Sequence, residues 1–167
     1  MPDASPRELL QPSLLDRLTD NEPNKNVESR EQRIMSLRQL KASVLRDLAW
    51  LLNTGNLEST EDLSAYPEVA KSVLNYGVRD LTGIMSSSVK ASEIERVLHQ
   101  AILRFETRII PHTLRVTATI NKDEASHNAI TFEISADMWA QPIPEHLYLQ
   151  TRIDLETGET EVTAAAR

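Results

Sequence analysis

The hydrophobic pattern of this chain changes its period once, within residues 104–116, RFETRIIPHTLRV. Apolar residues before this segment recur about every 3.6 positions, as on one helix face, and those after it alternate, as in a strand with one buried face. The residues concerned are Ile94, Leu98, Ala101 and Phe105 before the join, and Leu114, Val116, Ala118 and Ile120 after it. Helices first and a sheet second predict an α+β fold.

The clearest helix is predicted over residues 28–52. Its apolar stripe consists of Ile34, Leu37, Leu40, Val44, Leu48 and Leu51. Residues 53–55 predict its end, because Gly55 readily takes the left-handed conformation.

Two further helices are predicted before the join. One runs from Pro67, whose fixed φ suits a first helical turn, to Gly77. Its buried face would consist of Val69, Val73 and Tyr76. The other starts near Ser92, which has capping-box spacing to Glu95, and ends at about residue 105.

After the join, alternation predicts an antiparallel or mixed β-meander in the same single domain. The expected strands cover residues 114–120, 130–136, 147–153 and 159–163, with polar turns at residues 121–128 and 155–159. The domain therefore spans residues 28–163. A proline-rich irregular arm, residues 1–27, precedes it, and a frayed tail, residues 164–167, follows it.

Charge and composition exclude several classes of function. The net charge is −7 with a pI near 5.1, so nucleic acid is not the expected partner. There is no cysteine, and no histidine pair has zinc-site spacing, so we expect neither a metal nor a cofactor. The chain lacks a signal peptide and a long apolar stretch, which is typical of a cytoplasmic protein without membrane insertion.

One short segment of the arm, SLLDRL at residues 13–18, has the pattern of a helical turn. Ser13 is a suitable cap, and Leu14, Leu15 and Leu18 would then form a small apolar face. Two interpretations remain open: the segment packs on its own domain, or it docks on a neighbouring protein.

Glu106 and Arg108 lie at the join itself, among apolar neighbours. Such a pair could serve catalysis, fix the fold, or bind a partner. As the acid of a glycoside hydrolase Glu106 is a poor candidate, because a neighbouring cation keeps a carboxylate ionised and no second carboxylate is specified. From the residues alone, two interpretations remain open: the pair fixes the fold, or it binds a partner, where the bidentate geometry of arginine gives orientation and specificity.

Five motifs in a fixed order carry a resemblance to a known family. They are SLLDRL at 13–18, VLRDLAWLLNT at 44–54, YPEVAKSVLNYGVRDLTG at 66–83, FETRI at 105–109 and WAQPIPEHLYLQTRIDLETGE at 139–159. In these motifs the chain resembles the TssE family, small baseplate proteins of bacterial type VI secretion systems. That family is homologous to a wedge protein of contractile-tail phage baseplates that has been labelled lysozyme-like.

The resemblance implies a non-enzymatic assembly role, and with it that Glu106 and Arg108, as an exposed pair in the junction motif, serve the wedge interface more than the fold. Partners would be the wedge subunits TssF and TssG, with TssK in the same assembly, and the sheath subunits TssB and TssC, whose first ring would receive strands. The place would be a baseplate docked at the cytoplasmic side of the inner membrane. A peptidoglycan hydrolase and a free-standing binding protein are the alternatives.

Two positions of these motifs bear on binding. The family's junction usually reads Glu-Pro-Arg, and here Thr107 replaces the proline, which gives the helix end a less rigid stop. Trp139 would close its own core or, as the alternative, anchor an interface, where tryptophan is enriched.

Overall fold

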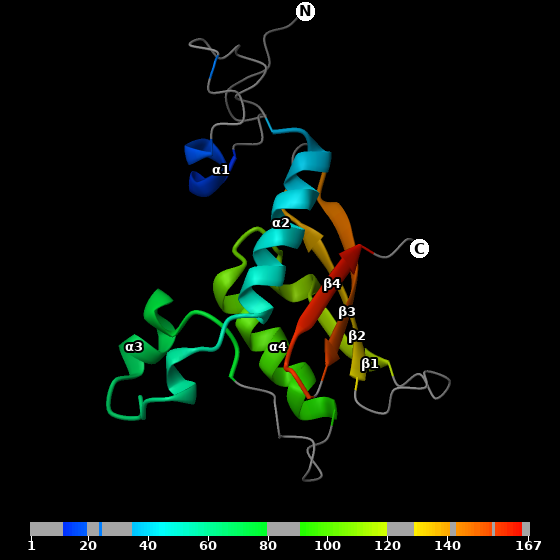
Figure 1. Cartoon of the computed structure of the whole chain (residues 1–167). Helices are drawn as coiled ribbons and strands as arrows, with labels where there is room; N and C mark the ends of the chain where they lie inside the picture. The colour runs from blue at the N-terminus through cyan, green and yellow to red at the C-terminus, as the bar shows by residue number, and fades with distance from the viewer. Residues whose placement is uncertain are drawn as a thin grey trace, which may run out of the picture.

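The computed structural model describes residues 12–19, 24, 35–79, 91–119, 129–140, 143–154 and 156–164. Within them, helices and an antiparallel sheet form two layers (Figure 1). The helices are α1 (Leu14–Leu18), α2 (Leu37–Leu52), α3 (Pro67–Lys71) and α4 (Ala91–Phe105), with 3-10 turns η1 (Leu57–Ser59), η2 (Val73–Asn75) and η4 (Pro111–Thr113). The strands are β1 (Arg115–Thr119), β2 (Ala129–Met138), β3 (Glu145–Asp154) and β4 (Thr160–Ala164). The predicted α+β single-domain fold is confirmed.

The sheet is a meander in the order β1-β2-β3-β4, and every described pair is antiparallel. One face of β2 and β3 is buried through the alternating residues Phe132, Ile134, Ala136, Met138, Leu147, Leu149 and Ile153. Helices α2 and α4 pack on this face and supply the other half of the core, with α2 near β4 and α4 near β1. The turn predicted at residues 121–128 lies outside the described residues.

Helix α2 begins at Leu37. Residues 35 and 36 were predicted to be helical but precede the helix, so the prediction is wrong at these two positions. Residues 28–34 lie outside the described residues. A capping box fixes the start: the Ser36 hydroxyl accepts from the Gln39 N–H, and the Gln39 side chain accepts from the Ser36 N–H. At the other end, Asn53 is the cap, and Gly55 does not take the predicted left-handed conformation.

Helix α4 begins at Ala91, so Ser92 lies inside its first turn and the predicted capping box is wrong. Glu95 has a different role, because its carboxylate accepts a 2.6 Å hydrogen bond from the Ala118 N–H of β1. The helix ends at Phe105 as predicted. Thus α4 is tied to the first strand by a side chain as well as by the core.

The helix predicted over residues 67–77 is shorter, because α3 ends at Lys71 and Ser72 is extended. The Ser72 hydroxyl accepts from the Leu74 N–H and starts the 3-10 turn η2. The expected burial of Val73 is wrong, since Val73 is 79% exposed. None of the described helices combines the length and the apolar character that a membrane-spanning segment requires.

The predicted arm and tail lie mostly outside the described residues. Within the arm, α1 has the helical turn that SLLDRL predicts, with the Ser13 hydroxyl accepting from the Asp16 N–H. At the other end of the chain, β4 extends to Ala164.

Candidate functional site

The junction between α4 and the sheet turns sharply over three residues. Glu106 still donates its N–H to the Ile102 carbonyl of α4, at 2.9 Å, and Thr107 and Arg108 form a turn. The next residue, Ile109, bridges to Met138 at the end of β2. The chain therefore leaves the helix at Glu106 even though Thr107 replaces the family proline.

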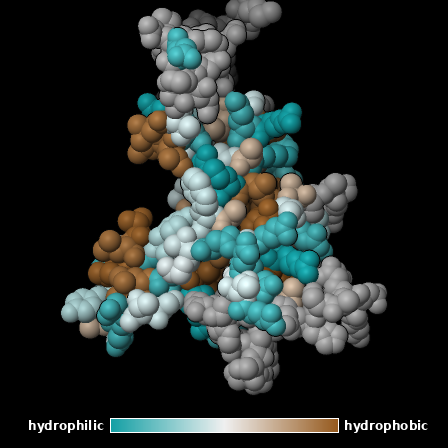
Figure 2. All heavy atoms as spheres, viewed as in Figure 1, coloured by the Kyte–Doolittle hydropathy of each residue, from teal (hydrophilic) through white to brown (hydrophobic). Residues whose placement is uncertain are grey.

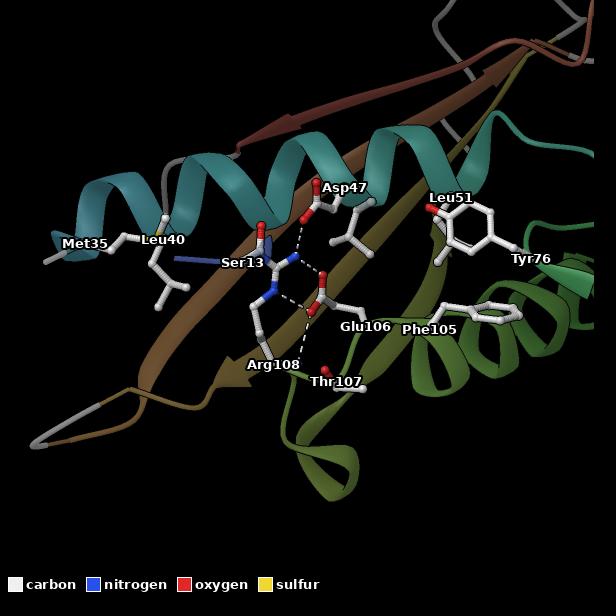
Figure 3. A pocket seen from close by; sticks show the side chains of 11 residues that line it. Ser13, Met35, Leu40, Asp47, Leu51, Tyr76, Phe105, Glu106, Thr107 and Arg108 are labelled. Carbon is white, nitrogen blue, oxygen red and sulfur yellow. Dashed lines mark hydrogen bonds and ion pairs between the residues drawn. The ribbon is translucent and has the colours of Figure 1, made fainter. Parts of the chain in front are cut away.

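Glu106 and Arg108 point the same way, toward α2 (Figure 3). The Arg108 guanidinium binds both carboxylate oxygens of Glu106, through Nε at 2.7 Å and through Nη2. The Arg108 backbone N–H donates to the same carboxylate at 3.0 Å. The pair is therefore a bidentate, charge-assisted contact in which the turn itself takes part.

Two residues of α2 complete this network. Arg108 Nη2 lies 2.6 Å from Oδ2 of Asp47, and Nη1 donates to the Ser43 hydroxyl at 3.1 Å. Glu106 is only 5% exposed, whereas the Arg108 and Asp47 side chains are 23% and 24% exposed. We call Ser43, Asp47, Glu106 and Arg108 the junction network.

The junction network holds Arg108 in its charged form. Burial lowers the pKa of the Arg108 guanidinium, but the hydrogen bonds and charges of Glu106 and then Asp47 raise it well above its ordinary value. Burial, followed by the charges of Asp47 and Glu106, also raises the pKa of the nearby Tyr76 hydroxyl. The Arg108 guanidinium is therefore a fixed positive charge at the centre of the junction network.

The expectation that Glu106 and Arg108 form an exposed pair is wrong for Glu106, which is buried. Their hydrogen bonds run to α2 within the same chain, so the network joins the junction to the helical layer. Sequence reasoning missed Ser43 and Asp47, which are some 60 positions away from Arg108. The sequence contains a sign of their role, because both are polar residues at helical spacings that place them beside the apolar stripe of α2.

Three residues of the network, Asp47, Glu106 and Arg108, line a groove of about 450 Å³. Figure 3 shows Met35 and Leu40 toward one end and Tyr76 and Phe105 toward the other. Tyr76 and Phe105 stack edge to face with 5.1 Å between ring centroids. Ser13, the cap of α1, also lines the groove. The groove thus combines an ionic wall with apolar ends.

Helix α1 is attached to α2 by polar contacts. Asp16 of α1 accepts a 2.6 Å hydrogen bond from Nη1 of Arg46, which also stacks on Trp50. The three leucines Leu14, Leu15 and Leu18 are 71%, 45% and 73% exposed. The apolar face predicted for this segment therefore remains largely uncovered.

Acid should release α1 from α2. Burial raises the pKa of Asp16, but hydrogen bonds from Arg46 and Ser13 outweigh it, so the pKa lies below the usual 3.8. A lowered folded-state pKa stabilises the contact above the unfolded-state value, and that stabilisation is lost as the pH falls through the folded-state value. Hydrogen exchange of the α1 amides, relative to α4, should therefore rise selectively below about pH 4.

Asp16→Asn is the matched control for this titration. It should show rapid exchange in α1 already at neutral pH, with no further selective change on acidification. Equal protection of α1 in the wild type at neutral and acidic pH would contradict the role given to Asp16.

Trp139 does not close the core, because it is 61% exposed, and so the interpretation favoured from its sequence context is wrong. Its backbone N–H donates to the Arg108 carbonyl at 2.7 Å, which places it directly beside the junction. Ile143 is 73% exposed in the loop that follows. The exposed side chain of Trp139 therefore belongs to a residue that is hydrogen-bonded directly to the junction.

Comparisons with known proteins give one match. The family model described as baseplate wedge protein gp25 matches residues 38–143, more than half of the chain. No curated protein and no solved structure matches. The matched segment contains α2 except for its first residue, the junction network and β2. A structural role in a phage-like baseplate, in contact with other baseplate subunits, follows from this match, since the chain belongs to the family of the baseplate wedge protein gp25.

Proposed function

We propose that the chain is a structural baseplate component of a type VI secretion system. It binds the wedge subunits TssF and TssG, with TssK in the same assembly, and helps to start the contractile sheath of TssB and TssC. The observation that carries this proposal is the family match over residues 38–143. The TssE-like motifs at 13–18 and 139–159, which reach beyond that match, favour a secretion system over a phage tail.

The wedge subunits bind along the groove beside the junction network. Arg108 is the partner-binding cation, since part of its side chain stays exposed. Glu106 serves partner binding from a buried position, by orienting the side chain of Arg108. The exposed leucines of α1 and the indole of Trp139 provide apolar contacts near the same groove, and exposed apolar groups of this kind are typical of interfaces.

The sheath adds its strand at the outer edge of β4. The Asn53 side chain already occupies one position of this edge, accepting from the Thr160 N–H at 2.8 Å and donating to the Thr160 carbonyl at 2.7 Å. Backbone hydrogen-bonding directions alternate along an antiparallel strand. The backbone N–H and C=O groups of Val162 and Ala164 therefore face the same edge as those of Thr160. The segment of β4 that receives the sheath strand is therefore the one beyond Thr160.

The hydrolase alternative has one supporting observation, a second carboxylate, because Asp47 lies across Arg108 from Glu106. Yet both carboxylates accept hydrogen bonds from the same guanidinium, so neither is placed as a protonated acid. We therefore propose a structural, non-enzymatic role, at a baseplate docked at the cytoplasmic side of the inner membrane.

Sheath assembly in cells tests this proposal. Cells that lack the chain and carry fluorescent TssB should form no sheaths, and the wild type should restore them. Leu14→Ser/Leu18→Ser should restore few, because it removes apolar contacts from exposed positions without disturbing the core. The exposed-surface control Arg96→Ala should behave as wild type. Normal sheaths in cells without the chain would refute the proposal.

A further inference from the structure

A second apolar surface lies away from the junction, on residues 57–75, which we call the α3 lobe. Figure 1 shows this lobe projecting from the body of the domain. Tyr66, Val73 and Leu74 in the lobe are 62%, 79% and 68% exposed. Figure 2 shows hydrophobic side chains gathered in this region, on the same side of the molecule as those of α1. Neighbouring large apolar side chains exposed to this degree mark binding surfaces in soluble proteins.

Hydrogen bonds inside the lobe fix the turn that carries these exposed side chains. Asn75, only 1% exposed, accepts from the Glu58 N–H at 2.9 Å and donates to the Ala70 carbonyl at 3.0 Å. Arg104 of α4 donates to the same carbonyl at 2.9 Å. The turn that carries Val73 and Leu74 is therefore fixed before any partner binds, and a preorganised surface loses little conformational entropy on binding.

The charge of the lobe defines its partner. The lobe carries four exposed carboxylates in addition to its apolar residues, and they are Glu58, Glu61, Asp62 and Glu68. Lys71 is the one basic residue of the lobe sequence, and it lies 3.9 Å from Glu68. Two copies of the lobe facing each other would bring these carboxylates together, and an anionic membrane would repel them. The complementary surface is apolar with Lys and Arg at its margins.

We propose that Val73 and Leu74 of the α3 lobe dock a basic amphipathic helix of a neighbouring wedge protein. The two side chains enter its apolar face, and the exposed carboxylates of the lobe pair with its Lys and Arg residues. This inference rests on the proposed wedge function and adds a contact surface distinct from the junction network.

Binding to the TssF–TssG complex encoded with this chain tests the inference. Val73→Ser/Leu74→Ser should weaken binding at least about tenfold, because central apolar residues dominate interface energies. Its melting temperature should stay unchanged, since both side chains are exposed. Leu37→Ser, at an exposed leucine at the start of α2, is the matched control and should bind as wild type.

Charge reversal provides a second, independent arm. Glu61→Lys/Glu68→Lys should slow association, and the difference from wild type should shrink as salt is added. Glu161→Lys on β4 makes the same kind of charge change at an exposed position outside the lobe and should have little effect.

The outcomes separate the two claims. If the wild type binds and the Val73/Leu74 variant binds equally well, the lobe inference is wrong and the proposed function stands. If the wild type does not bind TssF–TssG, both fail. Self-association or binding to anionic vesicles that is lost in the Val73/Leu74 variant would assign the surface to another occupant and overturn the inference.

Discussion

Arg108→Ala should lower the free energy of unfolding by about 2–4 kcal/mol, because it leaves the carboxylate of Glu106 buried without its cation. This loss of unfolding free energy is toward the lower end of what breaking a buried ion pair costs, because the Arg108 side chain is partly exposed. The melting temperature should fall by roughly 5–15 °C. Arg96→Ala removes an exposed arginine that donates a 3.4 Å hydrogen bond to Gln100, and it should be nearly neutral.

A second substitution identifies the cause. If the unpaired carboxylate is the main penalty, Glu106→Gln/Arg108→Ala should be more stable than Arg108→Ala alone, because the buried charge is gone. Thermal and denaturant unfolding of the three proteins measures this directly. An Arg108→Ala protein that melts like the wild type would mean that the junction network contributes little to the fold.

Gly77→Ala should cost at least about 2 kcal/mol, since strained backbone and overpacking act together. Gly77 has φ of 118°, which residues with a side chain rarely adopt, and an added Cβ would lie 2.2 Å from the Thr54 carbonyl oxygen. That carbonyl accepts the Val78 N–H at 2.9 Å, so the clash would also disturb the joint between α2 and the α3 lobe.

Gly55→Ala is the matched control, because an added Cβ at Gly55 meets no atom within 4 Å. It should be neutral or slightly stabilising, through a less flexible unfolded chain. Denaturant titration compares the two variants. Equal stability of Gly77→Ala and Gly55→Ala would show that the close approach to Thr54 does not constrain the fold.

Periodicity predicted the sheet well, because each strand has one buried face and alternation is a local property. The helix ends were harder, since they depend on single hydrogen bonds. Ser36 rather than residue 28 starts α2 because its hydroxyl and the Gln39 side chain satisfy the free N–H groups there. Glu95, expected to cap α4, binds the Ala118 N–H of β1 instead, a contact that no local pattern contains.

The candidate site was predicted in part. The unusual placement of Glu106 and Arg108 in an apolar segment pointed to the junction, but the residues they bind, Ser43 and Asp47, come from a helix that only the fold brings near. Trp139 illustrates the same limit. Its apolar chemistry fits a core or an interface equally, and only its exposure in the folded chain separates the two.

Complex formation with the wedge subunits tests the central claim most directly. The purified chain should be mixed with TssF–TssG at micromolar concentration and separated by size-exclusion chromatography with light scattering. A baseplate wedge protein should elute in a stable complex of defined mass. Elution of the chain entirely on its own, from a preparation that unfolds cooperatively, would contradict the account.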